Sequence, residues 1–181
     1  MTIQTARLEL KLMTAAFMQA LLDGVHEGAA AEIGYKIPAD WELPNWILER
    51  RIKQLAQDTK LAQWQLRVMA LKQSGVIVGH IGFHTRPGPK YLAKRSPGGV
   101  ELGYAVFEQR RRKGYASEAV MGLLKWAHRE HGVQRFIFSI DPDNQPSLGL
   151  ARKLGFKYLD THIDPDDGPE DIMEYVYGEH E

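Results

Sequence analysis

The segment with the clearest chemical character is a basic turn that leads into a helical pattern. It reads Arg110-Arg111-Arg112-Lys113-Gly114-Tyr115-Ala116. The first four N–H groups of a helix have no acceptor within the helix, and the aligned peptide dipoles leave partial positive charge at that end. A glycine allows a phosphate group to approach such a backbone closely. We therefore expect this turn to bind a phosphate-bearing ligand.

The turn does not match two other phosphate-binding motifs. It lacks the spacing Gly-x-x-x-x-Gly-Lys-Ser/Thr of nucleoside-triphosphate loops, and it lacks the Gly-x-Gly-x-x-Gly of dinucleotide-binding folds. A structural interpretation stays open, in which Arg110 to Lys113 form a solvated basic turn and Gly114 only permits an unusual backbone angle. If the turn does bind a ligand, a side chain added at Gly114 should weaken binding more than folding.

Two pairs of histidines could suggest a metal site. His80 and His84 share one predicted strand, and His128 and His131 share one predicted helix. The sequence pattern places no carboxylate or third ligand beside either pair, as a zinc site would require. We therefore predict no metal.

The composition argues against several classes of chemistry and partner. The chain has no cysteine, which excludes disulfides, thiolate-ligated zinc and a cysteine nucleophile. Its 23 basic and 23 acidic side chains balance, so we expect no nucleic-acid partner. No apolar run approaches the ~20 residues of a membrane span, so we expect no membrane partner. Residues 1–7 lack the features of a secretory signal, so the expected location is cytoplasmic.

One strand and one helix must hold the basic turn in place. Gly99–Phe107 alternates polar and apolar residues, and the run from Tyr115 to about His131 carries an apolar stripe at helical spacing. Arg135–Ile140 is the next predicted strand. A strand-helix-strand unit of this length implies a parallel pair joined by a right-handed crossover. The predicted fold class is therefore mixed α/β.

The remaining elements complete one predicted domain over residues 1–181, a length that suits a single core. They are a strand at Arg7–Leu12, a helix from Thr14 to near Gly24, a helical region after Pro44, a hairpin of Trp64–Leu71 and Val76–Phe83, an irregular loop at 85–99, a short helix from Asn144 to Gly155, and a final strand pair around 156–162 and 172–177.

The motifs together resemble the GCN5-related N-acetyltransferase (GNAT) family. Its signature, Gln/Arg-x-x-Gly-x-Gly/Ala, is matched by Arg111-x-x-Gly114-x-Ala116. The resemblance looks closest to the branch that includes the ribosomal-protein N-terminal acetyltransferases (RimJ/RimL-like). It extends over most of the chain, through Thr5–Leu10, Glu101–Tyr104, Asn144–Ser147 and Ala151–Phe156.

The resemblance implies both the fold and the cosubstrate. The expected fold is α/β (α+β): a central mixed, mostly antiparallel sheet of about seven strands, flanked by helices, in which the parallel strands 100–107 and 135–140 splay apart. Acetyl-coenzyme A would place its pyrophosphate on the amides of the basic turn and its pantetheine arm between the splayed strands. The cofactor-binding residues implied by the resemblance are Tyr104, Ala105, Val106, Arg111, Arg112, Lys113, Gly114, Tyr115, Ala116 and Asn144. Asn144 has a structural alternative as a helix N-cap.

The resemblance also implies how protons would move. An amine of pKa about 10.4 arrives protonated at neutral pH, so a base must take a proton. Glu101 is the candidate base, acting directly or through water; the alternative is an edge glutamate that faces solvent. Many family members carry a tyrosine acid at the position of Ala151, so this chain departs from the pattern. That departure leaves Ser147 as a candidate donor, although Ser147 also suits the first turn of a helix.

The resemblance also implies a reaction and a class of acceptor. The expected reaction is transfer of an acetyl group to a primary amine, from an N-terminal peptide or a small molecule, by direct attack in a ternary complex. The acidic segment 164–171 is expected to form the last loop, for which a solvated loop tip is the favoured interpretation and attraction of a cationic amine is the alternative. Two alternatives stay open: a non-catalytic acyl-coenzyme A binding module, and an acyltransferase with a different acyl donor or acceptor. The chain is expected to be a monomer or a homodimer.

Overall fold

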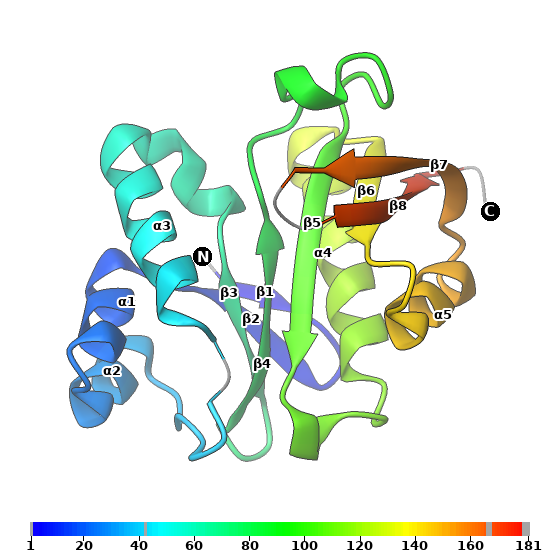
Figure 1. Cartoon of the computed structure of the whole chain (residues 1–181). Helices are drawn as coiled ribbons and strands as arrows, with labels where there is room; N and C mark the ends of the chain where they lie inside the picture. Colours follow the sequence, from blue (N-terminus) through cyan, green and yellow to red (C-terminus); the bar gives the residue numbers. More distant parts are fainter. Residues whose placement is uncertain (1, 42, 166–167, 179–181) are drawn as a thin grey trace. The chain divides into compact units, whose positions relative to one another are not determined.

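The computed structural model describes residues 2–41, 43–165 and 168–178, and Figure 1 shows its helices and strands. The strands are Thr2–Gln4 (β1), Leu8–Leu12 (β2), Arg67–Leu71 (β3), Ile77–Phe83 (β4), Val100–Val106 (β5), Arg135–Ile140 (β6), Lys157–Asp164 (β7) and Gly168–Val176 (β8). The helices are Ala15–Leu22 (α1), His26–Ile33 (α2), Asn45–Gln57 (α3), Tyr115–His131 (α4) and Gln145–Lys153 (α5), with 3₁₀ turns at Thr59–Trp64 (η1), Lys90–Leu92 (η2) and Glu108–Arg110 (η3).

The strands form a mixed sheet in which one pair is parallel. Their order is β1-β2-β3-β4-β5-β6-β8-β7, which makes eight strands. The parallel pair is β5–β6, where Val100 lies opposite Phe136 and Glu101 opposite Ile137. The pairs β1–β2, β2–β3, β3–β4, β6–β8 and β7–β8 are antiparallel. The predicted fold class is confirmed, with eight strands where about seven were expected.

The chain divides into two compact units, residues 1–82 with 104–123 and residues 83–103 with 124–181. Strand β5 and helix α4 each contribute residues to both units. The prediction of a single domain over residues 1–181 stays a prediction.

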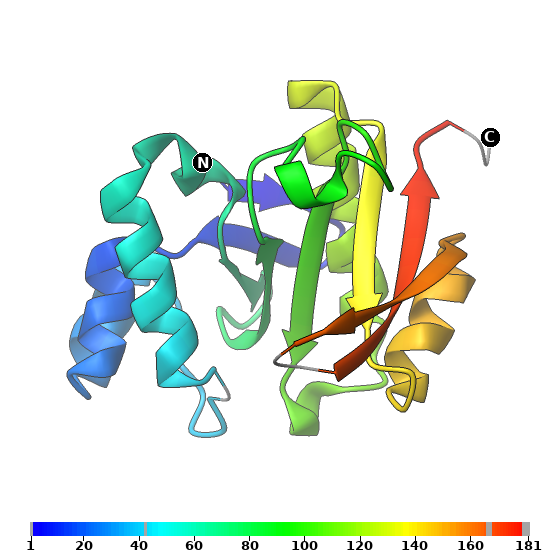
Figure 2. The same cartoon turned by 45° about the horizontal axis from the view of Figure 1, so that its top comes forward.

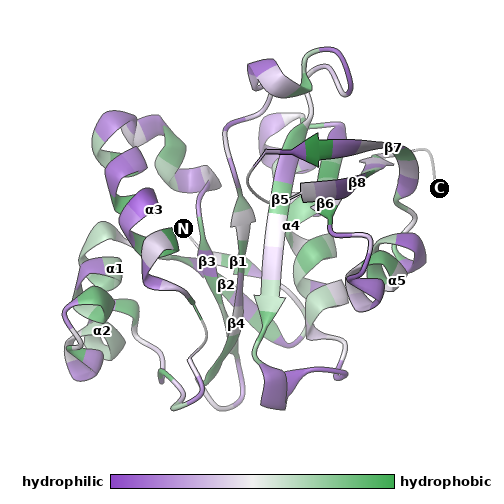
Figure 3. Cartoon of the chain, in the orientation of Figure 1, coloured by the Kyte–Doolittle hydropathy of each residue, from purple (hydrophilic) through white to green (hydrophobic). Residues whose placement is uncertain are grey.

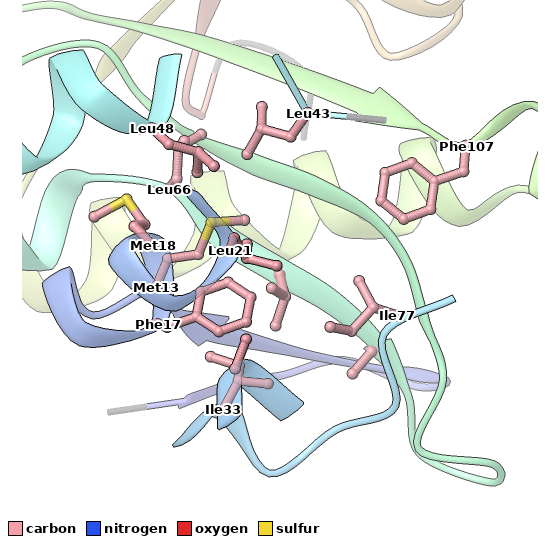
Figure 4. Close-up of a cluster of buried hydrophobic side chains, with 13 residues drawn as sticks. Met13, Phe17, Met18, Leu21, Ile33, Leu43, Leu48, Leu66, Ile77 and Phe107 are labelled. Carbon is pink, nitrogen blue, oxygen red and sulfur yellow. The ribbon is translucent and has the colours of Figure 1, made fainter. Parts of the chain in front are cut away.

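In the first unit, helices α1, α2 and α3 pack on one face of strands β3 and β4. The side chain of Thr14 accepts the N–H of Phe17 at 3.0 Å, which caps α1 as the sequence predicts. The apolar sides of the helices and alternate residues of the strands then meet in one buried cluster, drawn in Figure 4. Its members include Phe17, Met18, Ile33, Leu48, Val68, Ala70 and Ile77.

The opposite face of these strands is covered by the first half of α4. Leu10 of β2 lies opposite Met69 of β3, and both side chains are fully buried. Gly122 of α4 lies against this face, because a Cβ atom there would be 2.6 Å from the Thr5 side chain and 3.9 Å from Leu10. The lack of a side chain at Gly122 therefore lets α4 approach β2 and the segment before it closely.

In the second unit, aromatic side chains fill the core between β6 and its helices. Phe83 stacks on Trp126 of α4 with 6.5 Å between ring centroids, and on Phe136 of β6 with 6.3 Å. Phe156, which follows α5, lies 4.7 Å from Phe138 by the same measure. Figure 2 shows the β7–β8 hairpin of this unit in orange and red.

The loop between β4 and β5 lies on the other face of β6 and β8. Leu92 of this loop forms a small buried cluster with Ile137 and Ile172. The hydroxyl of Ser96, which is fully buried, donates to the carboxylate of Glu174 at 2.6 Å. A predicted irregular loop is thus confirmed, apart from the short η2 turn, and buried contacts hold it on the sheet.

One strand and one α-helix were not predicted from the sequence. Strand β1 has only three residues, so it offers too little alternation to be recognised. Helix α2 buries only Ala29 and Ile33, so its apolar stripe is too narrow to show a helical period. It ends at Gly34, which has φ 75° and closes the helix as a left-handed cap.

The acidic segment 164–171 is not the loop that the sequence predicted. Strand β7 continues to Asp164, and β8 begins at Gly168, while Asp166 and Asp167 lie outside the described residues. Thr161 lies opposite Asp171 and donates its hydroxyl to that carboxylate at 2.8 Å. The prediction was wrong because acidic residues disfavour strands on average, whereas cross-strand pairing outweighs that preference here.

The cluster in Figure 4 gives a test of the first unit's core. Phe17 is fully buried, and its ring lies 6.0 Å from that of Trp41. We expect Phe17→Ala to lower the free energy of unfolding by about 3–5 kcal/mol, because the cavity left behind cannot be filled. Urea denaturation measures it. Val25→Ala is the control, since Val25 is 53% exposed and its truncation should cost less than about 0.5 kcal/mol. Equal losses for the two variants would contradict this packing.

Candidate functional site

The basic turn contains two left-handed backbone conformations, two residues apart. Arg112 has φ 61° and Gly114 has φ 79°. Within residues 2–41, 43–165 and 168–178, Arg112 is the one non-glycine residue with a positive φ. Such strained residues cluster at ligand-binding sites. Left-handed residues within a turn direct successive N–H groups to one concave surface, a geometry that binds anions.

Helix α4 begins immediately after this turn. The N–H of Glu118 donates to the Gly114 carbonyl at 3.2 Å, so the amides of residues 115–117 precede the first helical hydrogen bond. The positive end of the helix dipole therefore adds to the N–H groups of the turn. Residues 111–114 are exposed, and Figure 3 colours η3 and the segment after it as hydrophilic. A dissolved anion can reach them.

Arg7, from the segment before β2, ties the turn to α4. Its Nη1 donates to the Lys113 carbonyl at 2.9 Å, and its Nε pairs with Glu118 at 2.6 Å. Its guanidinium also lies 4.9 Å from the ring centroid of Tyr115. A trans peptide points its C=O and its N–H in opposite directions. Because Arg7 holds the Lys113 carbonyl, the N–H of Gly114 points away from Arg7.

Glu118 keeps this arrangement charged. Its Oε1 accepts from the Thr5 hydroxyl and the Arg7 backbone N–H, each at 2.5 Å. Burial alone would raise the pKa of Glu118, but the hydrogen bonds from Thr5 and Arg7 and the charge of Arg7 together lower that pKa below its usual value. The carboxylate therefore stays ionised and holds a cation beside the turn.

Strand β5 leads into the turn, and Arg111 closes the connection. The Nε of Arg111 donates to the Val106 carbonyl at 3.0 Å. Tyr104 and Ala105, just before Val106 on the strand, are half-buried. Nine of the ten residues predicted to bind the cosubstrate thus lie in the first unit, at the end of β5, in the turn and at the start of α4. They are Tyr104, Ala105, Val106, Arg111, Arg112, Lys113, Gly114, Tyr115 and Ala116.

Glu101, the predicted base, lies in β5 and is 9% exposed, so it is not an edge glutamate that faces solvent. Its Oε2 accepts from the Tyr91 hydroxyl at 2.7 Å, and its Oε1 lies 3.5 Å from Nδ1 of His84. The loop between β4 and β5 thus supplies partners to the buried carboxylate. A buried charge without such partners would cost several kcal/mol.

These partners determine the acidity of Glu101. Burial raises its pKa, but hydrogen bonding and charge attraction from His84 and hydrogen bonds from Ser139 and Tyr91 outweigh burial and lower the pKa to about 2. Glu101 is therefore ionised at neutral pH. A carboxylate of such acidity accepts a proton only weakly.

The remaining predicted residues lie at the start of α5. The side chain of Asn144 accepts the N–H of Ser147 at 3.2 Å, so Asn144 caps the helix. This cap is the structural alternative weighed for Asn144, and it leaves the side-chain nitrogen for another partner. Ala151 is fully buried. It contributes no acid from the position where many family members carry a tyrosine.

Among the residues that the structure describes, no group of three or more His, Asp or Glu side chains could hold a metal ion. In the same part of the chain, no helix combines the length and the hydropathy needed to cross a membrane. The absence of a metal stays a prediction.

Sequence reasoning missed four residues that contact the predicted site: Arg7, Glu118, His84 and Tyr91. Arg7 and Lys113 are 106 residues apart, and no local pattern reports such a contact. The sequence places Arg7 only at the start of a predicted strand and within the Thr5–Leu10 resemblance. His84 was considered only as a metal ligand with His80; its position at the end of a strand next to that of Glu101 could have suggested the pair.

Comparison with known proteins places these features in context. The family model described as an acetyltransferase (GNAT) domain matches residues 7–157. The uncharacterized N-acetyltransferase YjdG of Bacillus subtilis is 28% identical over 158 residues, which cover 85% of this chain and 88% of that protein.

Solved structures share the fold. An acetyl transferase from Salmonella typhimurium, which modifies the N-terminal serine of 50S ribosomal subunit protein L7/L12, has a TM-score of 0.66 at 15% identity over 97% of this chain and 99% of its own. RimL, a ribosomal L7/L12 alpha-N-protein acetyltransferase in complex with coenzyme A, has a TM-score of 0.66 at 14% identity over 97% and 98% of the two chains.

The left-handed turn predicts how a substitution at Gly114 will behave. In Gly114→Ala the new Cβ would lie 3.3 Å from Nη2 of Arg7, on a backbone of φ 79°. We expect a stability loss of about 1–2 kcal/mol from the left-handed strain. We also expect at least about tenfold weaker binding of coenzyme A in calorimetry, because the turn must shift away from the phosphate geometry.

Gly132→Ala is the matched control for that experiment. Gly132 follows α4, has φ 68°, and a Cβ there would meet no atom within 4 Å. Its substitution should cause a similar stability loss without changing the affinity for coenzyme A. Equal affinities for Gly114→Ala and Gly132→Ala would contradict a ligand-binding role for the turn.

The Arg7 network predicts a second effect on the same ligand. Arg7→Ala removes the donor to the Lys113 carbonyl and should weaken coenzyme A binding about three- to tenfold, as expected for the loss of one charge-assisted hydrogen bond. Lys72→Ala also removes one positive charge, from a side chain that donates to the Thr5 carbonyl and not to the turn. If Lys72→Ala weakens coenzyme A binding as much as Arg7→Ala does, then Arg7 acts only through its positive charge and not through its bond to the turn.

Proposed function

Because the chain belongs to the GNAT acetyltransferase family, whose domain model spans residues 7–157, we propose that it transfers the acetyl group of acetyl-coenzyme A to a primary amine. Its relatives include proteins named as N-acetyltransferases, and the chain is an acetyltransferase enzyme. The proposed reaction is direct attack of the amine on the thioester in a ternary complex, since no cysteine is present to carry an acyl group.

The observation that carries the proposal is the turn before α4. Left-handed residues at Arg112 and Gly114 gather backbone N–H groups at the positive end of a helix, which suits a diphosphate. A nucleoside triphosphate would also carry phosphates, but the turn lacks the lysine and hydroxyl spacing of a triphosphate loop. The pyrophosphate of coenzyme A is the ligand that matches the family and the turn together.

We assign the acyl-carrying arm to the backbone of β5. Tyr104, Ala105 and Val106 are half-buried or buried and lead directly to the turn. Their backbone groups would hydrogen-bond the arm or polarise the thioester carbonyl, whose oxygen gains negative charge in the transition state. In this proposal the side-chain amide of Asn144 contacts the arm while its oxygen caps α5.

The acceptor is proposed to be the α-amine of a protein or peptide. The Salmonella typhimurium neighbour modifies an N-terminal serine of a ribosomal protein, and RimL also acts on a ribosomal α-amine. A small-molecule amine is the second candidate. For either acceptor, Glu101 is proposed to take part in removing the proton, and Ser147, in the first turn of α5, to donate to the leaving thiolate or to orient water.

Two other functions would retain the same turn. A non-catalytic acyl-coenzyme A binding module is compatible with Ala151, which lacks an acidic proton. An acyltransferase with a longer acyl donor or an alcohol acceptor would also bind through the pyrophosphate. The protein is further proposed to act in the cytoplasm, as a monomer or homodimer, without a metal, a nucleic acid or a membrane as partner.

Thiol release from acetyl-coenzyme A tests the proposed function. Wild-type protein should release free coenzyme A only when an amine is added, and most rapidly with its preferred member of a panel of N-terminal peptides and small amines. Binding without turnover across the panel would favour the non-catalytic module. No heat in calorimetry with coenzyme A or acetyl-coenzyme A would remove the function altogether.

A further inference from the structure

The side chain of His84 occupies a defined place beside β5. Its backbone N–H donates to the Glu101 carbonyl at 2.9 Å, and its Nδ1 lies 3.5 Å from Oε1 of the same residue. The other ring nitrogen, Nε2, lies above Gly103, where a Cβ atom would be 2.8 Å away. Glycine at this position therefore makes room for the imidazole, whose outer edge lies against the strand two residues beyond Glu101.

His84 and Glu101 differ in their access to a substrate. The His84 side chain is 41% exposed, whereas that of Glu101 is 12% exposed. The second oxygen of Glu101 accepts from Tyr91. An amine that approaches from solvent would reach the imidazole, while the carboxylate is largely covered and engaged by its partners.

The basicity of the two groups also favours the imidazole over the carboxylate as the proton acceptor. The pKa of Glu101 is lowered to about 2, so protonating it from an ammonium is strongly unfavourable. Imidazole as a residue type exchanges its proton near neutral pH, which makes it the commonest general base. An ionised carboxylate beside Nδ1 favours the tautomer in which Nδ1 carries the proton and Nε2 can accept one.

Resting on the proposed function, we infer that His84 is the catalytic proton acceptor and that Glu101 is the positioning residue that orients its ring. The amine first loses its ammonium proton to solvent, and its lone pair then forms the new C–N bond at the thioester carbonyl carbon while the C=O π pair moves to oxygen. One remaining N–H proton passes to Nε2 of His84. The carbonyl re-forms as the C–S bond breaks, and the electron pair of that bond stays on sulfur. His84 returns the proton to that sulfur, so coenzyme A leaves as the free thiol.

This assignment accounts for the departure at Ala151. Many family members carry an acid at that position, whereas Ala151 here is fully buried in the core. A histidine that first accepts a proton and then returns it supplies both functions from one side chain. No separate acid from α5 is then required.

Neighbouring side chains hold the Glu101 carboxylate in place beside the His84 ring. Tyr91 and His84 are the titratable side chains that contact the carboxylate, and Ser139 of β6 adds a hydrogen bond. The loop that carries Tyr91 is anchored where the buried Ser96 hydroxyl meets Glu174. The carboxylate is therefore held by groups on two segments, the one between β4 and β5 and strand β6, and this fixes the oxygen that faces the imidazole.

Kinetics of His84 variants test the inference. With the best amine of the panel, His84→Ala should lower kcat/KM at least about 100-fold and leave the affinity for coenzyme A unchanged in calorimetry. Imidazole added to the buffer should restore part of the rate of this variant. His84→Asn, which can still donate to Glu101 but cannot act as a base, should be equally slow. His26→Ala, at an exposed position of α2, should retain the wild-type rate.

The pH profile separates a base from a structural histidine. Glu101 stays ionised between about pH 5 and 8 because its pKa is far below that range. The proton acceptor must be neutral to act, so the wild-type rate should be lower in acid than at neutral pH. This acidic limb should disappear in His84→Ala and His84→Asn. If either variant keeps at least half of the wild-type rate with the same acidic limb, the inference is overturned.

Nitrogen-15 NMR of the histidine rings gives a readout independent of turnover. At neutral pH, the neutral His84 ring should carry its proton on Nδ1 in the wild type, and Glu101→Gln should alter that tautomer balance. A proton on Nε2 in the neutral wild-type ring would also overturn the inference. The two proposals fail separately: absence of amine-dependent thiol release by the wild type removes the proposed function, whereas wild-type turnover that survives His84→Ala removes only the role of His84.

Discussion

The turn before α4 depends on a backbone conformation that the chain would not adopt without support. A left-handed non-glycine residue costs about 1–2 kcal/mol, and Arg112 is such a residue. The support comes from Arg7, which holds the Lys113 carbonyl, and from Glu118, which holds Arg7. The N-terminal segment is therefore part of the proposed binding site even though its own residues need not touch the ligand. It fixes the direction in which the following N–H groups point.

A similar constraint acts on the buried carboxylate of Glu101. Removal of a charge from water is unfavourable unless hydrogen bonds replace the lost solvation. Tyr91 and His84 provide those bonds from the segment between β4 and β5. The Ser96 hydroxyl, on Glu174, holds that segment on the sheet. An irregular loop is thereby held by polar partners as well as by Leu92, and the histidine beside Glu101 gains a fixed position.

Local patterns in the sequence predicted the elements that carry the site, and they could not predict the contacts between those elements. The helix at Tyr115–His131 was predicted because its apolar residues recur at helical spacing, and the cap at Asn144 because amide side chains favour that position. The bond between Arg7 and Glu118 joins residues 111 apart. Only the folded backbone brings them together. The loop predicted for the acidic segment 164–171 was wrong for a related reason: cross-strand pairing cannot be recognised from the sequence of one strand alone.

The proposed donor site is built from backbone groups, whereas the acceptor is selected by side chains. This difference explains why the acetyl donor of this enzyme is easier to infer than its acceptor. Backbone N–H groups are the same in every sequence, so a diphosphate site of this kind depends on the left-handed turn more than on side-chain identity. Acceptor choice rests on side chains, which a shared fold does not determine. Proton transfer through His84 would extend this freedom to α5, because residue 151 could then serve packing alone. Ala151 is fully buried, as expected for a position that no longer has to supply an acid.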